Sequence, residues 1–131
     1  MKIISIIARF LLGLIFLLFG LNGFLHFIPS SPPSGTAGQF VGALFVSHYL
    51  VPISLLQVIS AVLLLVNRYV PLALTLLAPI IVNILLIHTL MLPSGLPLAL
   101  LVTVLWVLVF LSVRSAFTGL LQQRVPGQAL R

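Results

Sequence analysis

The chain has 131 residues, of which 62% are hydrophobic and only 5% are charged. It contains six Lys or Arg residues, three His residues and no Asp, Glu or Cys, which gives a formal net charge of +6. Soluble domains carry roughly a quarter charged residues, so this composition indicates a protein of the membrane. The absence of Cys excludes disulfides and thiol redox centres, and the absence of carboxylates excludes the common acid–base pairs.

Four apolar stretches are long enough, or nearly so, to cross a bilayer as helices of about 20 residues each. They cover approximately residues 3–28, 50–66, 70–92 and 96–117. We therefore predict an all-α integral membrane protein, in which residues 1–131 form one domain with a four-transmembrane-helix up-down bundle. The first stretch is too long for a typical secretory signal and lacks a cleavage motif, so we expect an uncleaved span.

The connection between the first two predicted spans, residues 29–49, has two parts. Residues 29–38 are rich in Pro, Ser and Gly, which predicts a loop. The rest mixes apolar and polar residues and suits a short interfacial helix on the outer surface, with Tyr49 at headgroup depth. A simple extension of the second span explains the same residues equally well, so its start, near Phe40 or near Pro52, stays open.

The basic residues define an orientation. Four spans place all six of them on one side of the membrane, namely Lys2, Arg9, Arg68, Arg114, Arg124 and Arg131. The positive-inside rule then predicts a multi-pass membrane protein with both termini and Arg68 in the cytoplasm. Scattered single charges fit anionic headgroups better than nucleic acid. We therefore expect membrane lipid and other membrane-protein subunits as partners, and no nucleic acid.

Polar side chains inside the spans form the candidate site. Five of them lie in one depth zone near the predicted outer surface, namely Asn22, His26, Gln57, Asn83 and His88. Polar groups are costly in lipid, so each of these residues indicates a packing role or a function. One interpretation is that the three amides form hydrogen bonds between helices.

The other interpretation is that these five residues form a cofactor-binding pocket. Imidazole and amide groups could bind the carbonyls of a quinone head group. His26 and His88 could instead be axial ligands of a chlorophyll-type pigment, with haem as the less favoured macrocycle. No metal site is predicted, because three His residues have no carboxylates to orient them.

Small and special residues predict how the helices pack. Gly13 and Gly20 share one face of the first span, with Gly23 nearby, which predicts the close approach of another helix. Pro79 removes one backbone hydrogen bond from the third span and predicts a kink there. Trp106 is too deep for an interfacial belt, so it predicts a packing contact or a contact to a partner subunit.

Two stretches carry a family resemblance. The first span contains Asn-Gly-Phe-Leu-His-Phe at residues 22–27, and the third contains Leu-Ala-Pro-Ile-Ile-Val-Asn-Ile-Leu-Leu-Ile-His at residues 77–88. Over about residues 8–118 the chain resembles the DoxX family of small four-helix bacterial membrane proteins. The resemblance implies a four-helix bundle in the bacterial cytoplasmic (inner) membrane and an association with membrane oxidoreductases, including a thiosulfate–quinone oxidoreductase. Gln57 stands where members of the family usually carry Glu, which argues against a proton-coupled role.

We expect a non-catalytic accessory subunit of a multi-subunit membrane redox or photosynthetic electron-transfer complex. It would pack against partner helices and hold a quinone, pigment or lipid. The alternative is a stand-alone DoxX-like quinone-linked oxidoreductase component, and a third reading is a small carrier or channel, against which the absence of charge inside the spans argues. Acid–base chemistry would rest on His alone, so we do not expect the chain to be an enzyme by itself.

Overall fold

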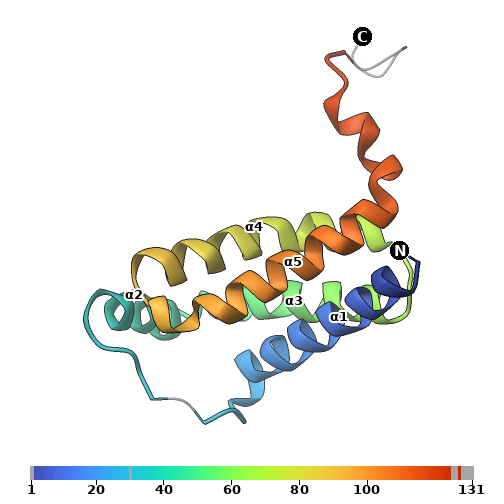
Figure 1. The fold of residues 1–131 in the computed structure, drawn as a ribbon. Coiled ribbons are helices and arrows are strands. Elements are labelled where there is room, and N and C mark those ends of the chain that lie inside the picture. The colour runs from blue at the N-terminus through green and yellow to red at the C-terminus, as the bar shows by residue number, and fades with distance from the viewer. Residues whose placement is uncertain (1, 30, 125–126, 128–131) are drawn as a thin grey trace.

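The computed structural model describes residues 2–29, 31–124 and 127, and this part of the chain is helical with short connections (Figure 1). In chain order the elements are α1 (Lys2–Leu25), α2 (Gly35–Val46), α3 (Leu50–Leu65), α4 (Val70–Leu90), the short 3-10 helix η1 (Pro93–Gly95), α5 (Leu96–Val113) and the 3-10 helix η2 (Arg114–Leu121). The predicted all-α class is confirmed.

Helix length and hydropathy define a multi-pass membrane protein. In the described part of the chain, α1, α4 and the continuous segment Pro93–Leu121 are each long and apolar enough to cross a membrane. The pair α2 and α3 makes a fourth span if the two helices are taken together. The 16 residues of α3 alone reach about 24 Å, which is shorter than a hydrocarbon core of about 30 Å.

A sharp break separates α2 from α3, and the two helices are bent by 85°. The break is a helix stop in which His48 has a left-handed backbone, with φ 59°. The Tyr49 N–H donates to the Leu44 carbonyl at 3.0 Å, and the His48 N–H donates to the Phe45 carbonyl at 3.2 Å. These two bonds satisfy carbonyls that a helix end leaves free. α3 therefore begins at Leu50, and it does not continue α2 as one straight helix. The two helices together still qualify as one broken span.

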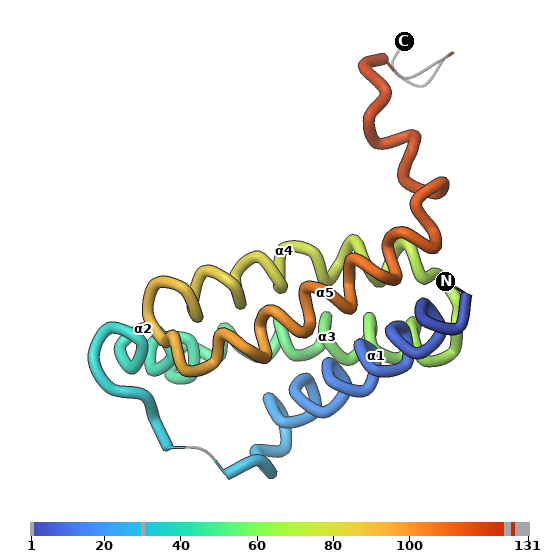
Figure 2. Tube along the Cα trace, viewed as in Figure 1, coloured from blue at the N-terminus to red at the C-terminus, as the bar shows by residue number. Residues whose placement is uncertain are grey.

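The long helices form a closed ring of antiparallel neighbours (Figures 1 and 2). α1 packs against α3 and α5, and α4 packs against the same two helices. The centre of the ring is filled by apolar side chains with almost no exposure, including Leu12, Leu64, Leu74, Leu77 and Val109. The predicted up-down topology is thus confirmed for the helices that pack together.

The glycines of α1 lie against α3, as the sequence predicted for a close helix approach. A Cβ built on Gly13 or Gly20 would lie 2.9 Å from the nearest side-chain atom of α3. At Gly23 a Cβ would overlap the Ser54 hydroxyl and lie 2.7 Å from the Ser54 Cβ. Ordinary van der Waals contact begins at 3.4 Å. The α1–α3 contact therefore depends on the missing side chains.

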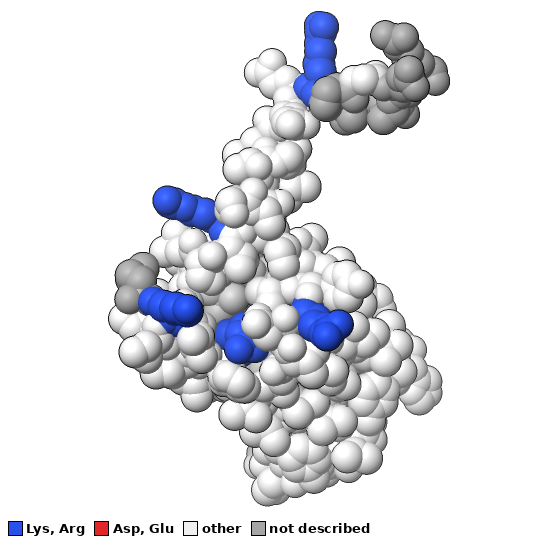
Figure 3. Space-filling view, turned by 90° about the vertical axis from the view of Figure 1, so that its right-hand side faces the viewer, with Lys and Arg blue, Asp and Glu red and all other residues white. Residues whose placement is uncertain are grey.

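Basic residues gather where α1 begins, where α3 meets α4 and where α5 ends (Figure 3). We call this the basic end of the bundle, and the opposite end the distal end. The described residues Lys2, Arg68, Arg114 and Arg124 belong to the first, whereas Arg131 lies outside the described residues. Arg9 donates from its guanidinium to the Leu64 carbonyl near the C-terminus of α3, where a helix favours positive charge.

Trp106 joins α5 to α4. Its indole N–H donates to the Leu74 carbonyl at 3.0 Å, and its ring stacks on Phe110 at 5.3 Å between centroids. Pro79 has no N–H, so the carbonyl of Thr75, the residue after Leu74, lacks its usual helical donor. α4 nevertheless continues to Leu90. The predicted packing role of Trp106 is confirmed.

Candidate functional site

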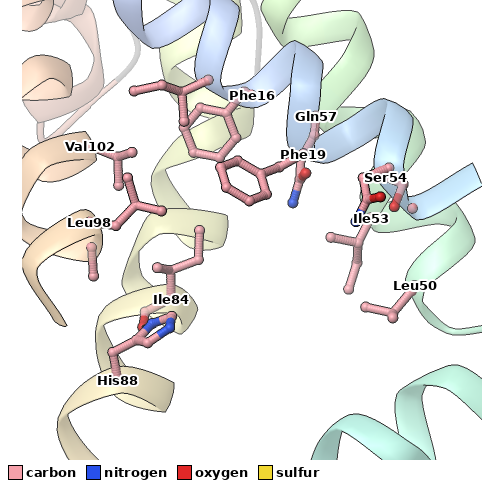
Figure 4. A pocket seen from close by; sticks show the side chains of 14 residues that line it. Phe16, Phe19, Leu50, Ile53, Ser54, Gln57, Ile84, His88, Leu98 and Val102 are labelled. Atoms are coloured by element: carbon pink, nitrogen blue, oxygen red, sulfur yellow. The ribbon is translucent and has the colours of Figure 1, made fainter. Parts of the chain in front are cut away.

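A cavity of about 350 Å³ lies in the distal half of the ring, between α1, α3, α4 and α5 (Figure 4). Most of its wall is apolar and includes Phe16, Phe19, Ile84, Leu98 and Val102. The polar groups in the wall come from three helices, namely Asn22 from α1, Ser54 and Gln57 from α3, and His88 from α4. An apolar cavity with a few converging polar groups is the usual form of a small-molecule site.

Asn22 shapes the end of α1 and also lines the cavity. Its side-chain oxygen accepts the Ile28 N–H at 2.8 Å, and its backbone carbonyl accepts the His26 N–H at 2.9 Å. Both bonds stabilise a helix stop in which His26 has φ 51°. In the described part of the chain, the side-chain NH₂ of Asn22 has no hydrogen-bond partner, so it is available to a ligand.

Gln57 and Ser54 lie one turn apart on α3 and face the same cavity (Figure 4). Gln57 is half-buried and Ser54 is buried. Neither side chain forms a hydrogen bond with another described residue. The Gln57 amide and the Ser54 hydroxyl can therefore form hydrogen bonds with a ligand in the cavity.

His88 has one ring nitrogen engaged and one left over. Its Nδ1 lies 2.8 Å from the Ile84 carbonyl of the same helix. Because a carbonyl only accepts, Nδ1 carries the hydrogen in this arrangement and Nε2 of the neutral ring is an acceptor. The ring lies directly over Gly95, where an added Cβ would overlap Cδ2 and Nε2. Gly95 therefore allows His88 to adopt this position.

Two of the five predicted site residues are absent from the wall of this cavity. His26 is exposed, and its ring contacts Phe45 of α2 edge-on at 5.6 Å between centroids. Asn83 is exposed, and its amide donates to the Pro79 carbonyl of its own helix at 2.8 Å. The structure thus brings together Asn22, Gln57 and His88 and leaves the other two outside. His26 and His88 are not placed on one cavity as a pair of axial ligands.

The interpretation of the amides as hydrogen bonds between helices is wrong for Asn22 and Asn83. Both side chains bond to backbone groups of their own helix or of the residues directly after it. Among the described residues, the side-chain hydrogen bonds that do cross between helices are those of Arg9 and Trp106. The bundle is therefore held by the glycine contact, apolar packing and these two bonds.

Sequence reasoning missed the roles of Ser54 and Gly95. Ser54 is the residue that Gly23 approaches. Its position one helical turn before Gln57 is a signal from which it could have been included in the candidate site. Gly95 lies in η1, between α4 and α5. Its contact with His88 depends on how η1 folds back on α4, which residue spacing alone does not define.

In comparisons with known proteins, no family model, no curated protein and no solved structure matches the chain. The fold and the site together define the class of protein. It is a small, all-helical, multi-pass membrane protein whose helices surround a largely apolar cavity.

Proposed function

We propose that this protein is a non-catalytic accessory subunit of a membrane redox complex, and that it holds a quinone-like molecule in the distal cavity. The observation that carries the proposal is the cavity itself, in which unpartnered polar groups of Asn22, Ser54 and Gln57 face a chamber of about 350 Å³. Small-molecule sites usually measure about 300–1,000 Å³, so the volume suits one substituted ring.

The polar groups favour a ligand that accepts hydrogen bonds. Asn22 and Gln57 each offer an amide NH₂, and Ser54 offers a hydroxyl. Phe16 and Phe19 supply aromatic surface beside them. A quinone head group combines a flat ring with carbonyl acceptors and usually carries an apolar tail, which suits a site bordered by lipid. A chlorophyll-type pigment is less well supported, because the Nε2 of His88 lies against Gly95.

The residues of this chain support the binding of a quinone better than its reduction. Reduction of a quinone to its quinol takes up two electrons and two protons. The chain has no Asp, Glu or Cys, so its own groups include no carboxylate to pass protons and no thiol to supply electrons. Electrons would therefore come from a partner subunit in the membrane. The DoxX-like stretches at residues 22–27 and 77–88 support this assignment as a family resemblance, and Gln57 in place of the usual Glu agrees with a binding role.

The same proposal includes an orientation. With the basic end in the cytoplasm, as the positive-inside rule favours, the cavity lies in the outer leaflet of a bacterial cytoplasmic membrane. The helix α2 would then lie at the outer surface, because it is bent by 85° from α3.

Quinone binding is tested with the purified protein in mild detergent and decylubiquinone as the probe. Trp106 is the chain's single tryptophan and lies one helical turn from Val102 in the cavity wall, so saturable quenching of its fluorescence reports binding. Gln57→Leu is expected to weaken binding about fivefold, since one net hydrogen bond contributes about 1 kcal/mol. The matched control is Asn83→Leu, an amide outside the cavity, which should leave the affinity unchanged. Equal effects of the two substitutions, or quenching that does not saturate, would contradict the proposed site.

The subunit part of the proposal has a separate test. Extraction of the native membrane in mild detergent, followed by size-exclusion chromatography and mass spectrometry, should recover the chain together with at least one other membrane protein. Recovery of a lone monomer from its native membrane would overturn the accessory role while leaving the binding site open to the fluorescence test.

A further inference from the structure

The basic end has no acidic side chain to balance it anywhere in the chain. The sequence contains no Asp and no Glu, and the described Lys and Arg side chains gather at one end of the molecule (Figure 3). Arg9 is engaged by the Leu64 carbonyl and the Phe10 ring, 4.6 Å from the guanidinium carbon. No side-chain carboxylate of this chain balances the other basic side chains.

A second cavity, of about 300 Å³, opens at this end between the beginning of α1 and the last turns of α5. We call it the basic-end groove. It is lined by Lys2, Ile4 and Ser5 of α1 and by Leu108, Leu111 and Ser112 of α5. One ammonium, two hydroxyls and three aliphatic side chains therefore share one depression, which is the composition expected for an amphiphilic ligand.

The polar atoms of the groove have distinct roles. The Ser5 hydroxyl donates to the Lys2 carbonyl at 3.0 Å, and the Ser112 hydroxyl donates to the Val109 carbonyl at 2.6 Å. Each hydroxyl donates its hydrogen to a backbone carbonyl of its own helix. The side-chain donor that the groove offers to a ligand is therefore the Lys2 ammonium. An ammonium donates charge-assisted hydrogen bonds and prefers an anionic acceptor such as a phosphate oxygen.

The aliphatic part of the groove points to the rest of the ligand. Ile4 and Leu111 are 50% and 42% exposed, and they line the same depression as Leu108. A free phosphate ion would leave these side chains uncovered. An acyl chain attached to the phosphate would cover them at a gain of about 25 cal/mol per Å² of apolar surface.

We propose that the basic-end groove binds one anionic phospholipid. Lys2 holds the phosphate, and the acyl chain lies along Ile4, Leu108 and Leu111. This site is at the opposite end of the bundle from the quinone-like ligand, so it is independent of the proposed function. Bound lipid would neutralise part of the positive charge of the basic end. It would also contact both the beginning of α1 and the last turns of α5.

Native mass spectrometry of the full chain, released from detergent micelles, tests this site directly. Phosphatidylglycerol is expected to remain attached as a single adduct under activation that removes phosphatidylcholine. Lys2→Gln should lower the retained fraction about tenfold, the effect of losing one hydrogen bond between charged groups. Added inorganic phosphate should not displace the lipid, since it lacks the chain that fills the aliphatic part.

The matched control is Arg124→Gln, which removes the same charge beyond η2, where the chain leads away from the bundle (Figure 1). It should change retention by less than about twofold, because exposed charges beyond about 8 Å are largely screened. Ser112→Phe fills the groove without changing the charge and should also remove the adduct, with circular dichroism confirming the fold. Equal losses in Lys2→Gln and Arg124→Gln, equal retention of the two lipids, or displacement by phosphate would each overturn the proposal.

Discussion

The close approach of α1 to α3 predicts that Gly23→Ala destabilises the bundle. The new methyl carbon would lie 2.7 Å from the Ser54 Cβ, against at least 3.4 Å in ordinary contact. Ser54 can rotate its hydroxyl but not its Cβ, so the end of α1 must move away by most of an ångström. Overpacking of this kind costs about 1–3 kcal/mol, and the higher helix propensity of Ala returns about 1 kcal/mol. The expected net loss is therefore about 1 kcal/mol.

The assay is unfolding of the protein in mixed micelles of increasing sodium dodecyl sulfate, followed by the fluorescence of Trp106. Gly42→Ala in α2 is the matched control, because a Cβ built on Gly42 has nothing within 4 Å. It adds the same helix propensity without the overlap and should raise stability slightly. Ser54→Gly should relieve the defect of Gly23→Ala, with a coupling of about 1–2 kcal/mol in the double-mutant cycle. If the two alanine variants are equally stable, or if the cycle shows no coupling, the packing argument fails.

Three further outcomes are expected. Trp106→Phe removes the bond to the Leu74 carbonyl and should lower the free energy of unfolding by about 1 kcal/mol, measured by circular dichroism; an unchanged midpoint would contradict this role. Gly95→Ala should displace the His88 ring and lower the melting temperature, and His88→Ala in the same chain should restore it; a double variant less stable than the single one would argue against the overlap. Arg9→Gln should destabilise the bundle by about 1.5–3 kcal/mol, the range for a bond to a charged group, and Arg9→Lys should retain part of that stability, whereas equal losses would exclude a contribution from the charge.

The spans were predictable because the apolar stretches are interrupted by strong local signals. The second and third spans meet at Asn67, which adopts φ 56° and closes α3 with bonds from the Asn67 and Arg68 N–H groups. Asn tolerates this left-handed conformation better than most residues. α3 and α4 therefore end and begin within two residues of the expected boundaries. The end of α1 differs by three residues because Asn22 stops the helix at Leu25.

The candidate site was predictable in depth but only partly in direction. Asn83 and His88 lie at similar depth, yet five residues at about 100° each place their side chains about 140° apart around α4. The two side chains therefore cannot both face the cavity, and His88 is the one that lines it. Asn22 and His26 would share a face only if α1 continued past His26. A polar residue that also ends its helix removes the periodicity on which the prediction depended.

The close contact between α1 and α3 joins two helices that do not follow one another directly in the chain. α3, α4 and α5 follow one another through short turns, whereas residues 26–49 separate α1 from the partner on which its glycines sit. Closing a long connection costs more chain entropy than closing a short one, so α3 to α5 are expected to assemble first and α1 to dock last. The residues between α1 and α2 then act as a tether. A chain cut between residues 31 and 34 should yield two pieces that recombine into the intact bundle.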